Sequence, residues 1–153
     1  MNHEKEYLIN HYQDTNVVSV SLNSRQWSRD YGSLDEIKLS NDIRFFLNRL
    51  NYKLFKRQFI KHQKRLGCKS VIQGDGVNKH LHCHLELEKP QHLSLQEFGV
   101  MIDECWGKTR FGRIRRMNVD VRKIYDKHGW LGYITRENKL KVDWLNCNDS
   151  TVE

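Results

Sequence analysis

The stretch Lys79–Glu88 alternates between apolar and polar side chains from residue 80 onward, which is the period of a β-strand with two unlike faces. One face carries Leu81, Cys83, Leu85 and Leu87, and the other carries His80, His82, His84, Glu86 and Glu88. The apolar face needs a core, whereas the polar face has to point away from that core. The chain must therefore build a sheet around this strand, with one side covered and the other side rich in histidine.

The segments on either side predict the remaining elements. We expect strands at Asn16–Leu22, Lys69–Gln73 and Ile114–Val121, and helices opening at Ser40, at the Ser94–Glu97 capping box and over Trp130–Asn138. The order strand, helix, strand, strand, helix, strand, helix is typical of the split βαβ arrangement. We predict an α+β fold, an antiparallel sheet of four to five strands with helices on one face and the histidine strand at its centre.

The length of 153 residues predicts one domain. We expect a flexible segment at 1–14, the folded domain at 15–145 and a flexible tail at 146–153. The four cysteines (Cys68, Cys83, Cys105, Cys147) lie far apart and form no CxxC pair, which indicates reduced thiols.

Charge composition points to the partner. Lysine and arginine number 26 against 19 aspartates and glutamates, which gives a net charge of +7 and favours a polyanion. No apolar run approaches the roughly 18 residues of a membrane helix. The first residues lack the basic-then-apolar order of a secretory signal, so we expect a cytoplasmic protein with no membrane partner.

Histidines at every second position of a strand form a candidate metal site. Same-face neighbours lie roughly 6.6 Å apart, close enough for two imidazoles to share one ion, whereas His80 and His84 lie roughly 13 Å apart. His82 belongs to either possible pair. Mg²⁺ or Mn²⁺ also needs oxygen ligands, for which we prefer Gln73 on the neighbouring strand and keep Glu86 in reserve. The alternative is a solvated, histidine-rich face that binds no metal.

The motif His82-Cys83-His84 resembles the histidine–hydrophobe–histidine motif of HUH single-strand DNA endonucleases. Downstream, Tyr125–Glu137 resembles the tyrosine motif of rolling-circle replication initiators from small plasmids and phages. The run Val17–Leu22 and the segment Trp106–Gly112 resemble the strand and the helix end that accompany these motifs. The resemblance covers roughly residues 16–140, in the expected order.

This resemblance implies a ferredoxin-like or RNA-recognition-like fold and a nicking and joining activity on single-stranded DNA. Tyr133 would be the nucleophile and Arg136 its neighbouring cation, with His82, His84 and Gln73 holding Mg²⁺ or Mn²⁺ and His80 as the alternative ligand. Relatives commonly have lysine at the position of Arg136 and an acidic residue at the position of Gln73. Tyr125 is the other candidate nucleophile, but no cation follows it at three residues.

A basic stretch follows the second helix and would track the DNA phosphates; its members are Lys108, Arg110, Arg113, Arg115 and Arg116. The expected partner is single-stranded DNA or an origin hairpin. The chain has no GxxxxGK[ST] helicase motif, so a helicase would be supplied in trans by the host. Two other functions stay open: a single-strand transposase of an insertion sequence, and a nucleic-acid-binding module without chemistry.

Overall fold

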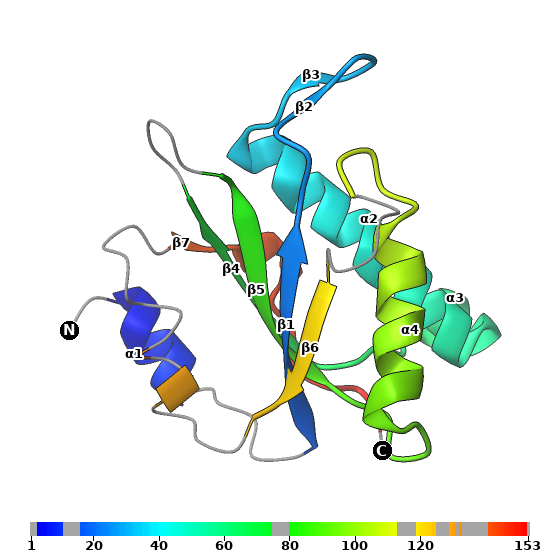
Figure 1. Cartoon of the computed structure of the whole chain (residues 1–153). Helices are drawn as coiled ribbons and strands as arrows, with labels where there is room; N and C mark the ends of the chain where they lie inside the picture. Colours follow the sequence, from blue (N-terminus) through cyan, green and yellow to red (C-terminus); the bar gives the residue numbers. More distant parts are fainter. Residues whose placement is uncertain are drawn as a thin grey trace.

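The structure is a computed structural model, and it describes residues 3–10, 16–74, 80–112, 119–124, 129–130, 132 and 141–152. Within them lies a five-stranded sheet in which every pair of neighbours is antiparallel. Its spatial order is β6 (Val119–Lys123), β1 (Val17–Asn23), β5 (His82–Glu88), β4 (Cys68–Gln73) and β7 (Lys141–Val142). The predicted α+β class with an antiparallel sheet is thereby confirmed (Figure 1). Of the strand predicted at 114–121, residues 114–118 lie outside the described residues.

Two helices cover the apolar face of the sheet. They are α2 (Glu36–Phe55) and α4 (Leu95–Trp106), which pack on each other and on the strands. The shared core includes Phe46 of α2, Trp106 of α4 and Leu85 of β5, all fully buried. The rings of Phe46 and Trp106 meet edge to face, with centroids 5.8 Å apart, and the Trp106 indole donates to the carbonyl oxygen of Asn23 at 2.8 Å. Burial of this apolar surface is what fixes the direction of the opposite, histidine-bearing face.

Helix α2 begins earlier than the sequence predicts. Its N-cap is Asp35, whose Oδ1 accepts from the backbone N–H of Lys38 at 2.8 Å, and not Ser40. Ser40 lies inside the helix, where its hydroxyl donates to Asp143 at 2.6 Å. A serine hydroxyl can serve a cap or a tertiary contact, and the local sequence does not distinguish these uses.

The same helix ends at Phe55. Lys56, with a φ of 53°, separates α2 from the short helix α3 (Arg57–His62). By contrast, the capping box predicted at the start of α4 is confirmed, because the Ser94 hydroxyl accepts from the Glu97 N–H at 3.0 Å and the Glu97 carboxylate accepts from the Ser94 N–H at 3.1 Å.

The histidine-bearing face is partly covered, although the sequence predicts helices on one face only. Within the segment 1–14, which the sequence predicts to be flexible, residues 3–10 form helix α1 (His3–Asn10). Leu8 of α1 is fully buried and packs with Val71, Trp130 and Val142 in a second apolar cluster. These side chains make an apolar patch on an otherwise polar face, and α1 covers it (Figure 1).

The end of the chain is also ordered by hydrogen bonds, in contrast to the predicted flexible tail at 146–153. A short 3₁₀ helix, η1 (Trp144–Asn146), precedes Asn148, which exchanges two backbone hydrogen bonds with Cys68, both at 2.9 Å. Further on, the Thr151 hydroxyl accepts from the Arg65 N–H at 2.8 Å. These contacts tie the C-terminal segment to β4 and to the chain that precedes it.

Candidate metal centre

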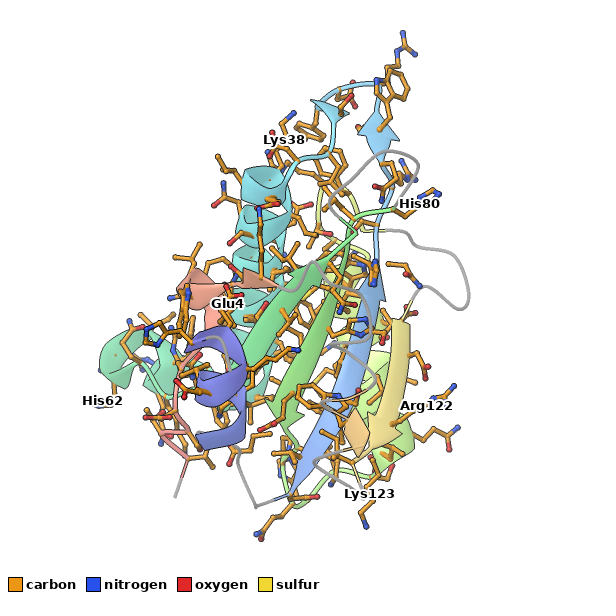
Figure 2. The ribbon with its side chains drawn as sticks, turned by 90° about the vertical axis from the view of Figure 1, so that its left-hand side faces the viewer. Glu4, Lys38, His62, His80, Arg122 and Lys123 are labelled. Carbon is orange, nitrogen blue, oxygen red and sulfur yellow. The ribbon has the colours of Figure 1, made fainter. Side chains whose placement is uncertain are left out.

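His82 and His84 lie side by side at the start of β5, on the face turned away from the core. Their ring centroids are 5.0 Å apart and the rings are nearly perpendicular, at 86°. His84 is 5% exposed and His82 is partly exposed, so the pair opens toward solvent on the His82 side. His80 precedes the strand, is exposed, and lies toward the end of the sheet that carries the hairpin of β2 (Trp27–Ser28) and β3 (Gly32–Ser33) (Figure 2).

Both imidazoles are hydrogen-bonded through Nδ1. Nδ1 of His82 lies 2.8 Å from the backbone oxygen of His80, which can only accept, so Nδ1 carries the proton. Nδ1 of His84 lies 3.0 Å from the hydroxyl of Ser21, which can act as the acceptor. In that arrangement both Nε2 atoms present lone pairs. Metal-binding histidines commonly donate their other nitrogen to such a partner.

Gln73 is the residue directly opposite His82 on β4. Its side chain is 4% exposed, and its Nε2 has no hydrogen-bond partner among the described residues. The two ends of an amide are assigned from their surroundings, so the unsatisfied atom can equally be the oxygen. A buried amide without a partner, next to two imidazoles, fits the oxygen ligand that the sequence predicts.

Glu86, the reserve ligand, lies on the same face but is engaged elsewhere. Its carboxylate is fully buried, 4.0 Å from the ammonium of Lys69, which is 1% exposed. Buried charges of opposite sign hold each other in place, because separating them leaves an uncompensated charge in a medium of low polarity. Gln73 is therefore the better third ligand.

Gln26 holds the backbone just before the histidine pair, a role that the sequence did not predict. Its amide spans both backbone groups of Leu81, accepting from the N–H at 2.8 Å and donating to the carbonyl at 3.0 Å. It thereby supplies the two hydrogen bonds that a further strand would make. A lone glutamine between two strands carries no sequence signal for such a contact.

Two histidines and one amide supply fewer ligands than Mg²⁺ or Mn²⁺ requires. Among the described residues, no group of three or more histidine, cysteine, aspartate or glutamate side chains could hold a metal ion. The set of His82, His84 and Gln73 contains only two such residues, so water would have to complete the coordination of Mg²⁺ or Mn²⁺. The residues present fit an ion of this kind on the strength of the paired imidazoles, both hydrogen-bonded through Nδ1, and the unsatisfied amide of Gln73.

The cysteines are not candidates for this centre. Cys68, Cys83 and Cys105 are buried and free, and Cys83 points into the core. Burial raises the pKa of the thiols of Cys68 and Cys83 well above its ordinary value, which keeps both protonated near neutral pH.

The predicted basic track divides into residues with different surroundings. The guanidinium of Arg110 donates to the buried carboxylate of Asp42 at 2.9 Å and lies over the rings of Tyr31 and Phe111. Lys108 is exposed at the end of α4. Arg110 therefore ties the loop after α4 to α2, whereas Lys108 is positioned to meet a ligand.

The other predicted site residues lie outside the described residues; they are Tyr125, Tyr133, Arg136, Arg113, Arg115 and Arg116. Their placement relative to the histidines stays a prediction from the sequence.

Comparison of the chain with models of known protein families, with curated proteins and with solved structures gives no match. Among the described residues, no helix is both long and apolar enough to cross a membrane.

Proposed function

We propose that the protein is a metal-dependent nuclease that nicks and rejoins single-stranded DNA, with Tyr133 as the nucleophile. The observation that carries the proposal is the imidazole pair of His82 and His84, whose ring centroids lie 5.0 Å apart and whose Nδ1 atoms are both hydrogen-bonded. The sequence motif at Tyr125–Glu137 adds the nucleophile. The role in vivo that we propose is initiation of rolling-circle replication in the cytoplasm.

The strand order supports the proposal at the level of topology. Counting only the strands of a split βαβ unit, β6, β1, β5 and β4 stand in the order 4-1-3-2, with α2 after the first strand and α4 after the third. Within the described sheet β5 has two strands on either side, so its polar side chains lie at the middle of the histidine-bearing face. A substrate strand lying on this face would pass directly over the histidines.

The proposed reaction is a balanced exchange of phosphodiesters. The Tyr133 phenol gives its proton to solvent and its oxygen attacks a DNA phosphorus. A 5′-phosphotyrosine bond forms while the bond between phosphorus and the 3′-oxygen breaks, and that oxygen takes up a proton from solvent to become a hydroxyl. The reverse step rejoins the strand, because the phosphoester bond is conserved in the intermediate. A bound Mg²⁺ or Mn²⁺ would polarise the phosphate.

The residues of this chain have two further tasks in that reaction. A phenol of pKa about 10 costs roughly 4 kcal/mol to ionise at pH 7, and Arg136, one helical turn after Tyr133 in a helix, would offset part of that cost. Arginine does so as a fixed positive charge, because it does not exchange its proton near neutral pH. His82, His84 and Gln73 would hold the ion.

The test is a search for a covalent protein–DNA adduct. The protein is incubated with labelled single-stranded DNA libraries and Mn²⁺, then denatured and separated by electrophoresis. We expect an adduct that disappears with excess chelator, in Tyr133→Phe and in His82→Ala, and persists in Tyr125→Phe. Arg136→Lys should retain or raise the yield, whereas Arg136→Ala should slow its formation.

Two results would contradict the proposal in different ways. If the adduct persists in Tyr133→Phe, Tyr133 is not the nucleophile. If single strands and hairpins bind but form no adduct, the protein is a nucleic-acid-binding module without catalytic activity. His80→Ala tests the pairing of the histidines, since a loss equal to that of His84→Ala would mean that the wrong two histidines have been paired.

A further inference from the structure

The opposite side of the molecule carries a basic surface that the metal site does not use. Residues 43–65, which span most of α2 and all of α3, contain eight lysines and arginines and no aspartate or glutamate. The whole chain has an excess of only seven positive charges. This part of the helical side, away from the histidines, is therefore strongly positive.

An open groove runs through this surface between α2 and α4. It is lined by Arg49, Tyr52, Lys53, Lys56, Glu104, Cys105 and Lys108. Four of these side chains are cations and one is a carboxylate, so the groove has a net charge of +3. Such a surplus in a concave surface attracts a polyanion and makes its binding dependent on salt.

The one carboxylate lies in an ion pair across the groove. Glu104 of α4 accepts from the ammonium of Lys53 of α2 at 2.8 Å. This hydrogen bond raises the pKa of Lys53 and lowers the pKa of Glu104, so both stay charged near neutral pH. With these two charges balanced, Arg49, Lys56 and Lys108 are left to attract an anion.

An aromatic ring lies among the cations. Tyr52 is 47% exposed, and the ammonium of Lys56 lies 5.6 Å from the centre of its ring. Arg49 and Lys56 are seven residues apart, or roughly 10.5 Å along the helix axis. A single strand of a few nucleotides spans this distance, so one short stretch of strand could meet both cations.

We propose that this groove between α2 and α4 binds a single strand of nucleic acid, with its phosphates on Arg49, Lys56 and Lys108 and a base on Tyr52. An exposed ring flanked by cations is the arrangement that binds unpaired bases together with their phosphates. A membrane-surface helix would instead present a broad apolar face beside its cations. Among the described residues that line this groove, Tyr52 and Cys105 are the uncharged ones.

The proposal does not depend on nicking, because the groove lies on the helical side and uses neither the histidines nor a metal. A strand held there is separate from the strand that would cross the histidine face. The protein would then hold two segments of nucleic acid at once, on opposite sides of its sheet.

The test measures the binding of a fluorescein-labelled 20-nucleotide oligothymidine in chelator, by anisotropy at several salt concentrations. Arg49→Gln combined with Lys56→Gln should weaken binding about tenfold or more and make the slope of log K against log salt shallower by about 1.4, or 0.7 per lost contact. The matched control, Arg57→Gln combined with Lys61→Gln, removes the same charge from exposed positions on α3 outside the groove. It should weaken binding less than threefold. Equal losses in both variants would overturn the groove and leave only a general effect of charge.

Tyr52 gives an independent readout. Tyr52→Ala should weaken binding at least about fivefold and Tyr52→Phe should restore it, because stacking needs the ring and not the hydroxyl. A photoreactive 4-thiothymidine strand should cross-link to the peptide that contains Tyr52. Cross-links confined to residues 80–88 would place the strand on the histidine face alone and overturn the proposal. Binding to phosphatidylserine vesicles is measured in parallel. If the Arg49/Lys56 variant lost vesicle binding but kept oligothymidine binding, the proposal would also be overturned.

Discussion

The hydroxyl of Ser21 on β1 lies 3.0 Å from Nδ1 of His84 on β5, and the two residues are direct partners across the strand pair. This contact orients the His84 ring and, with Nδ1 as the donor, fixes the tautomer in which Nε2 presents a lone pair. His82 obtains the same result from the backbone oxygen of His80 at 2.8 Å. One imidazole therefore depends on a side chain and the other on the main chain, so only the first can be altered by substitution.

The first prediction follows from that asymmetry. Ser21→Ala should weaken Mn²⁺ binding about tenfold or more, the usual loss when the hydrogen-bond partner of a metal-binding histidine is removed. Isothermal titration calorimetry measures the affinity. Ser21→Thr keeps a hydroxyl on a strand that favours β-branched residues, and should retain most of it. If the wild type and Ser21→Ala bind Mn²⁺ with equal affinity, Ser21 does not contribute to metal binding.

The second prediction concerns the third ligand. Gln73→Glu replaces a neutral amide oxygen with a carboxylate opposite His82, and should tighten Mn²⁺ binding because hard divalent cations prefer charged oxygen ligands. Gln73→Leu has a similar volume without a donor atom, and should weaken binding. The same calorimetric titration compares the three proteins. Unchanged affinity in both variants would exclude Gln73 as a ligand.

The histidine strand could be predicted well because its alternation is strict. With Cys83 and Leu85 in the core, the side chains between and beside them had to point to the other face, as they do. Gln73 is predicted on the neighbouring strand, and the structure places it directly opposite His82, a register that the sequence did not specify. The apolar period thus specified the direction of each side chain before any tertiary contact was known.

Helix α1 could not be predicted because its sequence offers little periodicity. Only a few apolar side chains occur in His3–Asn10, and the one known to be fully buried, Leu8, packs on an apolar patch formed by Val71 and Val142. That patch exists only after β4 and β7 have paired. Tertiary packing, more than local propensity, stabilises such a short helix.

Buried polar contacts are the other class that the sequence did not predict. Asp42 lies within the amphipathic pattern of α2, yet it is 2% exposed and bonds both Arg110 and the N–H of Phe111. Its partners come from a loop nearly 70 residues away in the sequence, so no local pattern announces them. Arg110 was accordingly interpreted as a phosphate contact.

The third prediction concerns the pH dependence of stability at the start of α4. The hydrogen bond from the backbone N–H of Ser94 holds the pKa of Glu97 below its ordinary value of 4.5, so the ionised carboxylate is favoured in the folded state. This contribution is present above the unfolded pKa and is lost as the pH falls through the folded value. We expect wild type to be more stable than Glu97→Gln at pH 7, and the difference to shrink as the pH falls below 4.5. Urea unfolding at several pH values measures it, and a constant difference would contradict the capping role.

The fourth prediction separates the structural cation from the binding cation near the end of α4. Arg110→Ala removes a charged hydrogen bond to a buried carboxylate and should lower the free energy of unfolding by about 1.5–3 kcal/mol. Lys108→Gln changes an exposed side chain and should alter it by less than about 0.5 kcal/mol. For DNA binding we expect the opposite pattern, in which the Lys108 variant changes the salt dependence and the Arg110 variant does not. Lys108→Gln should make the salt dependence of single-strand binding shallower by about 0.7, whereas folded Arg110→Ala should keep the wild-type slope, since its guanidinium is committed to Asp42. Thermal unfolding and anisotropy on the same two variants decide the matter, because a shallower slope in Arg110→Ala would return that arginine to the phosphate track that the sequence predicts.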